Sequence, residues 1–85
     1  MWEVLWDEKS LEDLQSLDKA TAKKIVNKVS KFLARDPISL GKPLSGRLSG
    51  LMRYRFGGYR VIFAVNKMVV QILVLRIGHR KNIYD

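Results

Sequence analysis

The sequence predicts a small α+β domain in which two N-terminal helices, folded back as a helical hairpin, pack on a mainly antiparallel β-sheet. Apolar residues recur at helical spacing through residues 11–33, whereas residues 52–77 contain three runs rich in aromatic and β-branched side chains. The length of 85 residues and the hydrophobic content of 47% fit one folded domain over residues 1–85. The expected order of elements is strand-helix-helix-strand-strand-strand.

The N-terminal part of the chain predicts a strand followed by two helices. Residues 2–6 alternate apolar and polar side chains, which is typical of a strand. Asp7 or Ser10 then caps a first helix whose leucines are spaced three residues apart. Asp18 is the cap candidate of a second helix over residues 19–35, which the following proline ends. The connection between the helices is short, so they fold back on each other.

The C-terminal half predicts a three-stranded antiparallel meander. Residues 36–50 are rich in proline, glycine and serine and predict an ordered loop. Turn dipeptides at Gly57-Gly58 and Asn66-Lys67 separate the three strands, which are expected at residues 52–56, 59–65 and 68–77. The last strand is apolar at nearly every position, so we expect it to be central and covered on both faces.

A two-residue turn at the double glycine fixes which side chains share a face of the sheet. Arg55 then lies directly across from Arg60, with Arg53 on the same face. Like charges in this position are destabilising by up to about 1 kcal/mol. We therefore interpret these three residues, the arginine triad, as a site for an anion, and phosphate matches the planar guanidinium best. The opposite face is apolar and packs on the helices; it carries Met52, Tyr54, Phe56, Tyr59, Val61, Phe63 and Val65.

The net charge of +8 is confined to the second half of the chain. Residues 1–40 hold seven acidic and seven basic groups, whereas residues 41–85 hold nine basic groups and one acid. Such segregation indicates an anionic partner, such as nucleic acid, a membrane surface or an acidic protein segment. Three more cations of this half are candidates for binding phosphate: Lys42, Arg47 and Lys81.

The composition excludes several classes of site. Without cysteine there is neither a disulfide nor a thiolate metal site, and one histidine excludes a multi-histidine centre. The second half has too few acids to bind a metal, so we expect neither a metal nor another cofactor. No apolar run approaches the ~20 residues that span a bilayer, and the N-terminus lacks a secretory signal. A cytoplasmic protein without membrane contact is therefore expected.

The last strand is expected to deliver a polar tail next to the arginine triad. In a meander the end of the third strand lies beside the turn between the first two. We therefore expect His79 and Arg80 to lie on one face with the triad and Tyr84 to follow within reach. Cations for phosphate and an aromatic ring for a splayed base are the groups that bind single-stranded RNA.

Three motifs, in this order, resemble the RelE branch of the RelE/ParE toxin superfamily over essentially the whole chain. They are a P-L-x-G loop at residues 43–46, an R-x-R-x-G-x-Y-R-V-x-F strand pair at residues 53–63 and G-H-R-x-x-x-Y at residues 78–84. The resemblance implies a fold similar to microbial ribonucleases and the toxin of a type II toxin–antitoxin system. It further implies an endoribonuclease that cuts mRNA in the ribosomal A site and is silenced by an antitoxin wrapped around it.

The resemblance also implies roles for individual residues. By position, the family's functional residues fall on Arg53, Arg55, Arg60, His79, Arg80 and Tyr84. Arginine does not act as a base, so we expect the arginines to stabilise charge on the phosphate and His79 or Tyr84 to transfer protons. The predicted catalytic set is Arg55, Arg60, His79, Arg80 and Tyr84; phosphate binding is predicted for Lys42, Arg47, Arg53 and Lys81.

Three alternatives stay open. A ParE-like toxin would inhibit DNA gyrase by protein contact, a non-catalytic RNA-binding module would use the cations without chemistry, and a decayed toxin would be inert. On the ribonuclease interpretation the expected partners are mRNA, the ribosome and an acidic RelB-like antitoxin. That antitoxin would fold onto the cationic face in a toxin–antitoxin hetero-oligomer.

Overall fold

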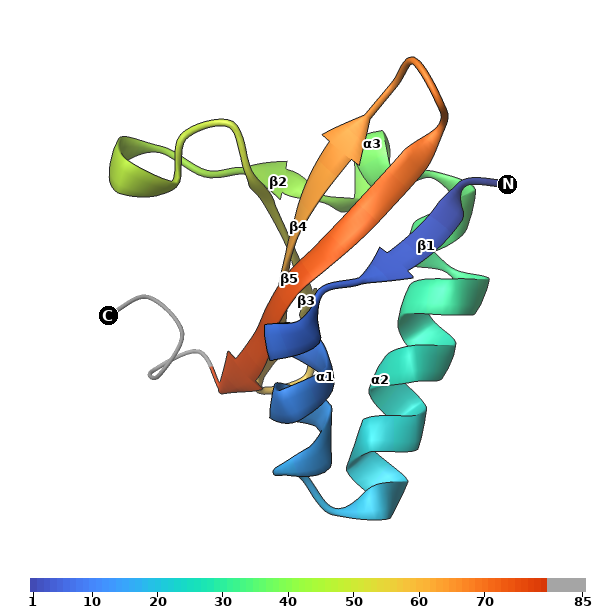
Figure 1. Ribbon diagram of the computed structural model, residues 1–85, viewed down its shortest axis with the longest axis vertical. Helices are drawn as coiled ribbons and strands as arrows, with labels where there is room; N and C mark the ends of the chain where they lie inside the picture. Colours follow the sequence, from blue (N-terminus) through green and yellow to red (C-terminus); the bar gives the residue numbers. More distant parts are fainter. Residues whose placement is uncertain (80–85) are drawn as a thin grey trace.

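The computed structural model describes residues 1–79, which form an α+β fold around a five-stranded sheet (Figure 1). The strands lie in the order β1-β5-β4-β3-β2; β1 pairs parallel with β5, and the other pairs are antiparallel. In chain order the elements are β1 (Glu3–Trp6), α1 (Glu8–Gln15), α2 (Lys19–Lys31), the 3-10 turn η1 (Leu33–Arg35), α3 (Pro37–Leu40), β2 (Lys42–Pro43), the 3-10 turn η2 (Gly46–Leu48), β3 (Met52–Phe56), β4 (Tyr59–Asn66) and β5 (Gln71–His79).

Side-chain caps start both N-terminal helices. The Asp7 carboxylate accepts a hydrogen bond from the Lys9 N–H at 3.0 Å, and Asp18 accepts one from the Thr21 N–H at 3.1 Å. Ser10, the alternative cap, lies instead inside α1, where its hydroxyl donates to the Asp7 carbonyl at 2.7 Å. The second helix ends at Lys31, earlier than predicted, and the chain continues through the turn η1.

The hydrophobic core lies between α2 and one face of the sheet, called the helix face below. Ile25 and Val29 of α2 are fully buried against Val61 and Phe63 of β4 and against the apolar residues of β5. The predicted apolar set packs here; its partly buried members are Met52, Tyr54, Phe56, Tyr59 and Val65. Within residues 1–79, no helix has the length and hydrophobicity needed to cross a membrane.

The predicted register of the first hairpin is confirmed. Arg55 pairs with Arg60 and Phe56 pairs with Tyr59, so the double glycine forms the two-residue turn. Gly57 has a φ of 60°, a conformation that residues with a Cβ rarely adopt. The turn chemistry is local, and this is why the sequence alone was enough to place these pairs.

Residues 36–50 were predicted to form an ordered loop, but they also contain the short elements α3, β2 and η2. Asp36 caps the short helix α3 by accepting from the Ser39 N–H at 3.3 Å, with Pro37 in the first helical position. The chain then lies beside β3 as the two-residue strand β2, in which Lys42 pairs with Arg53. This pairing depends on the path of the chain in three dimensions, so no local pattern indicates it.

The predicted turn at Asn66-Lys67 was wrong in length. β4 continues through Asn66, residues 67–70 form the turn, and β5 begins at Gln71. The Asn66 side chain accepts from the Met68 N–H at 3.1 Å, and Val70 has a φ of 55°. Residues 68–70 are apolar and two of them are β-branched valines, so their composition is typical of a strand although they lie in an exposed turn.

The strand β5 lies inside the sheet, as predicted, between β1 and β4. It is not covered on both faces: α1 and α2 pack on the helix face, while on the other face Leu73 is half-buried and Leu5 of β1 is 39% exposed. A bulge interrupts the pairing, because Ile62 pairs with Arg76 while Phe63 pairs with Val74. The face away from α1 and α2 is called the outer face below.

Candidate nucleic-acid interface

Four cations lie side by side on the outer face. Arg55 of β3 pairs directly with Arg60 of β4, and Lys42 of β2 pairs directly with Arg53 of β3. Residues that pair directly project to the same side of the sheet, and Arg53 and Arg55 are two positions apart in one strand. These four residues, the cationic row, therefore run across three neighbouring strands. The structure thus brings Lys42, which the sequence placed in a loop, to the arginine triad.

The centre of the outer face is held by a buried isoleucine. Ile62 is 3% exposed although α1 and α2 lie on the opposite face, and it pairs with Arg53 on one side and Arg76 on the other. Long cationic side chains cover apolar surface with their stems while their charged heads stay in water. Arg53 and Arg60 are half-buried and Arg55 is exposed, which agrees with this packing. The burial of Ile62 is thus consistent with arginine stems that lie along the outer face.

A small hollow borders the row. It has a volume of about 120 Å³ and lies beside β3, lined by Leu40, Tyr54 and three members of the row, Lys42, Arg53 and Arg55. Three positive charges around one concave surface raise the local concentration of anions. An anion in this hollow would contact cations of both β2 and β3.

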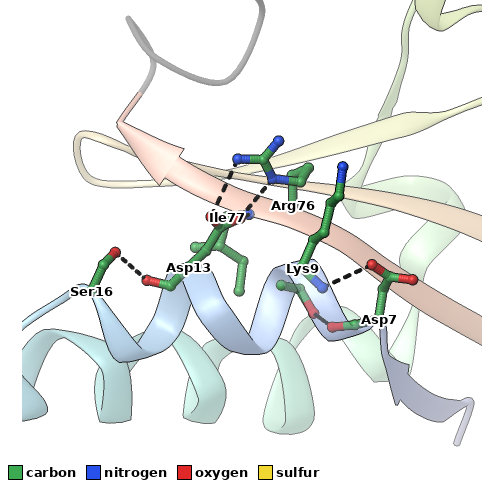
Figure 2. Close-up of polar contacts among 7 residues, drawn as sticks. Asp7, Lys9, Asp13, Ser16, Arg76 and Ile77 are labelled. Atoms are coloured by element: carbon green, nitrogen blue, oxygen red, sulfur yellow. Dashed lines mark hydrogen bonds and ion pairs between the residues drawn. The ribbon is translucent and has the colours of Figure 1, made fainter.

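Arg76 forms an ion pair with Asp13 of α1 (Figure 2). Its Nε and Nη2 donate to the Asp13 carboxylate at 2.9 and 3.3 Å, and the Ile77 N–H donates to the same carboxylate at 2.8 Å. The hydrogen bond to Asp13, and then its charge, raise the pKa of the Arg76 guanidinium. Arg76 is therefore a structural cation and not a member of the cationic row.

The bond from Ile77 to Asp13 has a clear origin. β1 ends at Trp6, which pairs with Val74, so the backbone of β5 beyond that point has no strand on this side. The helix α1 lies there, and Asp13 provides the acceptor that a strand would have provided. The role of Asp13 depends on where β1 stops, so no local sequence pattern indicates it.

His79 does not lie with the arginine triad, and the prediction of one shared face was wrong. His79 pairs with Tyr59, and their rings meet edge to face with centroids 5.2 Å apart. The residue across from Arg60 is Gly78. His79 is therefore on the helix-face side of β5, at the mouth of a groove of about 310 Å³ next to α1. Alternation along the strand was the signal that would have placed it.

The remaining predicted site residues divide into two groups. Arg80, Lys81 and Tyr84 lie outside the described residues. Arg47 is exposed on η2, within a loop that a hydrogen bond from the Leu44 N–H to the Leu51 carbonyl closes at 2.9 Å. Figure 1 shows this loop projecting away from the sheet beyond β2. Within residues 1–79, no group of three or more His, Cys, Asp or Glu side chains could hold a metal ion.

Comparison with known families decides the class of the protein. The model of a family described as the ParE toxin of the type II toxin–antitoxin system parDE matches residues 4–84. The chain belongs to the RelE/ParE toxin superfamily. Two curated relatives come from Mycobacterium tuberculosis (strain ATCC 25618 / H37Rv), and each aligns over 72 residues. The toxin is 32% identical to Toxin RelG, over 85% of this chain and 83% of the relative. It is 36% identical to Toxin RelE, over 85% of this chain and 74% of the relative.

Solved structures agree with this assignment. The toxin matches a chain of the toxin–antitoxin complex RelBE2 from Mycobacterium tuberculosis with a TM-score of 0.88 and 28% identity, over 93% of this chain and 98% of that chain. A chain of the intact RelBE complex of E. coli matches with a TM-score of 0.75 and 21% identity, over 93% and 96% of the two chains, which shows a common fold. The α+β architecture expected from the resemblance is thus that of RelE-like toxins.

Proposed function

We propose that this toxin is an endoribonuclease that cuts mRNA in the ribosomal A site, and that the cationic row binds the scissile phosphate and its neighbour. The observation that supports the proposal best is the direct pairing of Arg55 with Arg60, beside the pairing of Lys42 with Arg53. Each like-charge pair is destabilising in the free protein by up to about 1 kcal/mol. A phosphate bound between the two charged groups of a pair would replace their repulsion with attraction of both to the anion.

The chemistry requires attack by the ribose 2′-OH on the adjacent phosphorus, which forms a 2′,3′-cyclic phosphate and breaks the bond to the 5′-oxygen. A base takes the 2′-OH proton, and an acid or water protonates the departing 5′-oxygen. The arginines hold the charge that develops on the phosphoryl oxygens, but they do not accept the 2′-OH proton. His79 faces the other side of the sheet, so of the two proton-transfer candidates we assign this role to Tyr84, with Arg80 as a further cation. Alignment of the mRNA by the ribosome supplies positioning that this sparse site lacks.

We further propose that an acidic, RelB-like antitoxin covers the cationic row in a hetero-oligomer. Several similar solved structures are RelB–RelE complexes. Folding of a disordered acidic segment onto the row would neutralise its like-charge pairs and exclude mRNA. A toxin that acts on ribosomes works in the cytoplasm.

In-vitro translation of a defined mRNA, followed by primer extension, tests the proposal. Wild-type toxin is expected to produce discrete cuts at the A-site codon, and Arg55→Ala and Tyr84→Ala to abolish them. Lys67→Ala is the matched control, because Lys67 is exposed in the β4–β5 turn, away from the row. Intact mRNA with wild-type toxin, or cuts that survive Arg55→Ala, would contradict the proposal. RNA that is bound but never cut would favour a non-catalytic module.

Two observations favour a second candidate function, inhibition of DNA gyrase. The matching family model is that of the ParE toxin, and the chain's one histidine lies away from the cationic row. A supercoiling assay with purified gyrase separates the candidates: loss of supercoiling together with intact mRNA would place the toxin with gyrase inhibitors.

A further inference from the structure

The helix α2 is basic and has no acidic residue. It contains five lysines in 13 residues: Lys19, Lys23, Lys24, Lys28 and Lys31. Four of them are exposed, and Lys28 is half-buried. Within residues 1–79, none of them has a carboxylate within 4.0 Å. The charge total for residues 1–40 conceals these lysines, because the seven acids of that range, three of them in α1, balance its seven basic groups.

Three of these lysines form a stripe along one side of α2. Lys24, Lys28 and Lys31 are spaced four and three residues apart, which places them on one face of a helix over about 10 Å. Lys23 lies about 100° around the helix from Lys24 and belongs to the other flank, with Lys19. The three residues Lys24, Lys28 and Lys31 are called the lysine stripe below.

Lys28 shows where the stripe lies. Its Nζ is 4.4 Å from the ring centroid of Phe32 and 5.4 Å from that of Phe56, both within the range of a cation–π contact. Phe56 follows Arg55 in β3, and consecutive residues of a strand project to opposite faces. The stripe therefore lies on the helix face of the same strand whose outer face bears Arg53 and Arg55.

Within residues 1–79, no strand pairs beyond Arg53 with the edge of β3 that lies between these two cationic surfaces. β2 pairs only with Met52 and Arg53, so it leaves the edge of Tyr54 and Phe56 uncovered. The small hollow beside β3 also opens along this strand. Positive charge therefore continues from the cationic row, around the β3 edge, to the lysine stripe.

We propose that the cationic row and the lysine stripe form one track for the backbone of a single RNA strand, which turns around the β3 edge. This inference rests on the proposed function, in that the ligand of the row is RNA. The phosphate at Arg55 and Arg60 lies on the outer face, and the flanking nucleotides continue to Lys24, Lys28 and Lys31. Phe32, which is 47% exposed beside Lys28, offers a ring on which a base stacks.

An RNA strand fits this surface better than a protein segment does. Lysines on flexible stems, interleaved with an exposed aromatic ring, suit a chain that presents one phosphate and one base per step. Apolar side chains of a protein partner have a different place to bind: a hollow of about 860 Å³ on the outer face, lined in part by Leu5, Ala64 and Leu73. The two surfaces thus differ in the chemistry that they recognise.

The test measures binding without cleavage. Fluorescence anisotropy with a labelled 2′-O-methyl RNA of about 12 nucleotides, within the range of single-strand sites, reports affinity while the missing 2′-OH prevents cutting. The titration is repeated between about 50 and 200 mM salt to obtain the slope of the logarithm of the binding constant against the logarithm of the salt concentration. Each lost phosphate contact makes this slope less steep by about 0.7. The same series is run with a trinucleotide, which offers phosphates to the row but few nucleotides to continue along the track.

The variant Lys24→Gln/Lys28→Gln/Lys31→Gln is expected to lower the slope by about 2 and the affinity at about 0.15 M salt about 50-fold for the longer RNA. Trinucleotide binding should stay unchanged. The control Lys9→Gln/Lys19→Gln/Lys67→Gln loses the same charge away from the stripe and is expected to change affinity by about 3-fold or less, because salt screens distant charges. The variant Lys24→Gln/Lys31→Gln keeps the ring contacts of Lys28, so its expected slope change of about 1.4 does not depend on them.

Three results would overturn the inference. If the stripe variant binds the longer RNA like wild type while Arg55→Gln binds it weakly, the track is wrong and the proposed function stands. If the stripe and control variants lose equal affinity, the effect is one of net charge. If the stripe variant loses affinity for an acidic antitoxin peptide or for anionic vesicles but not for RNA, the stripe has another partner. Wild-type toxin that binds no RNA would contradict the proposed function itself.

Discussion

The rings of Tyr59 and His79 meet edge to face, with centroids 5.2 Å apart, on the side of the sheet opposite to Arg60. This contact holds the imidazole away from the cationic row, at the mouth of the groove beside α1. A Cβ at position 58 would lie 3.4 Å from the imidazole, in van der Waals contact, so the ring packs close to the turn. His79 is thus a candidate for contacts with a flanking nucleotide and not for proton transfer at the scissile phosphate.

This position predicts a small effect of removing the imidazole. His79→Ala is expected to lower A-site cleavage by less than about 10-fold, since a general acid or base contributes about 10²–10⁴-fold. Arg55→Ala, measured alongside, is expected to lose at least about 10²-fold, as for other groups that stabilise developing charge. Single-turnover primer extension on programmed ribosomes gives both rates. A loss for His79→Ala as large as that for Arg55→Ala would mean that the imidazole reaches the phosphate during the reaction.

The pairing of Arg55 with Arg60 predicts that stability and activity change in opposite directions. Arg55→Gln keeps most of the side-chain stem and removes a like charge from the pair, so the free toxin should become more stable by about 0.5 kcal/mol. For a chain of this size the corresponding rise in Tm is about 2–4 °C. Urea unfolding and thermal melts monitored by circular dichroism measure both quantities, and the same variant should lose cleavage.

The control for this prediction is Arg47→Gln. Arg47 is an exposed cation on η2 without a paired strand partner, so its substitution should change stability by less than about 0.5 kcal/mol. If Arg55→Gln is destabilising, the two guanidinium groups do not repel each other in the free toxin. The main support for an anion site at this pair would then be removed.

The sequence predicted those parts of the fold that local chemistry controls. The double glycine was enough to pair Arg55 with Arg60, and Asp18 was enough to locate the start of α2. Tertiary features were not accessible in this way. The strand β2 exists because the chain passes beside β3, and residues 68–70 look like a strand although the Asn66 side chain turns the backbone there.

The candidate site shows the same division. Arg53, Arg55 and Arg60 were placed on one face by counting residues from a turn, whereas Lys42 reached that face only through the pairing of β2. His79 was misplaced because nearness to the glycine turn was considered without the alternation of side chains along β5. The lysine stripe was missed because charge was summed over half the chain and not over each helix.

The contacts of Asp13 predict that its substitution and that of its ion-pair partner Arg76 lower stability by different amounts. Arg76→Ala removes only a partly exposed ion pair and is expected to cost about 0.2–1 kcal/mol of stability. Asp13→Ala also leaves the Ile77 N–H without its acceptor, at a residue that is 2% exposed, and is expected to cost about 2 kcal/mol. Asp13→Asn should lie between them, because its amide oxygen still accepts from Ile77. Urea unfolding of the three variants and of Asp13→Ala/Arg76→Ala completes a double-mutant cycle. Equal losses for Asp13→Ala and Arg76→Ala would show that the backbone of β5 does not depend on this carboxylate, and that packing of α1 alone holds the strand edge.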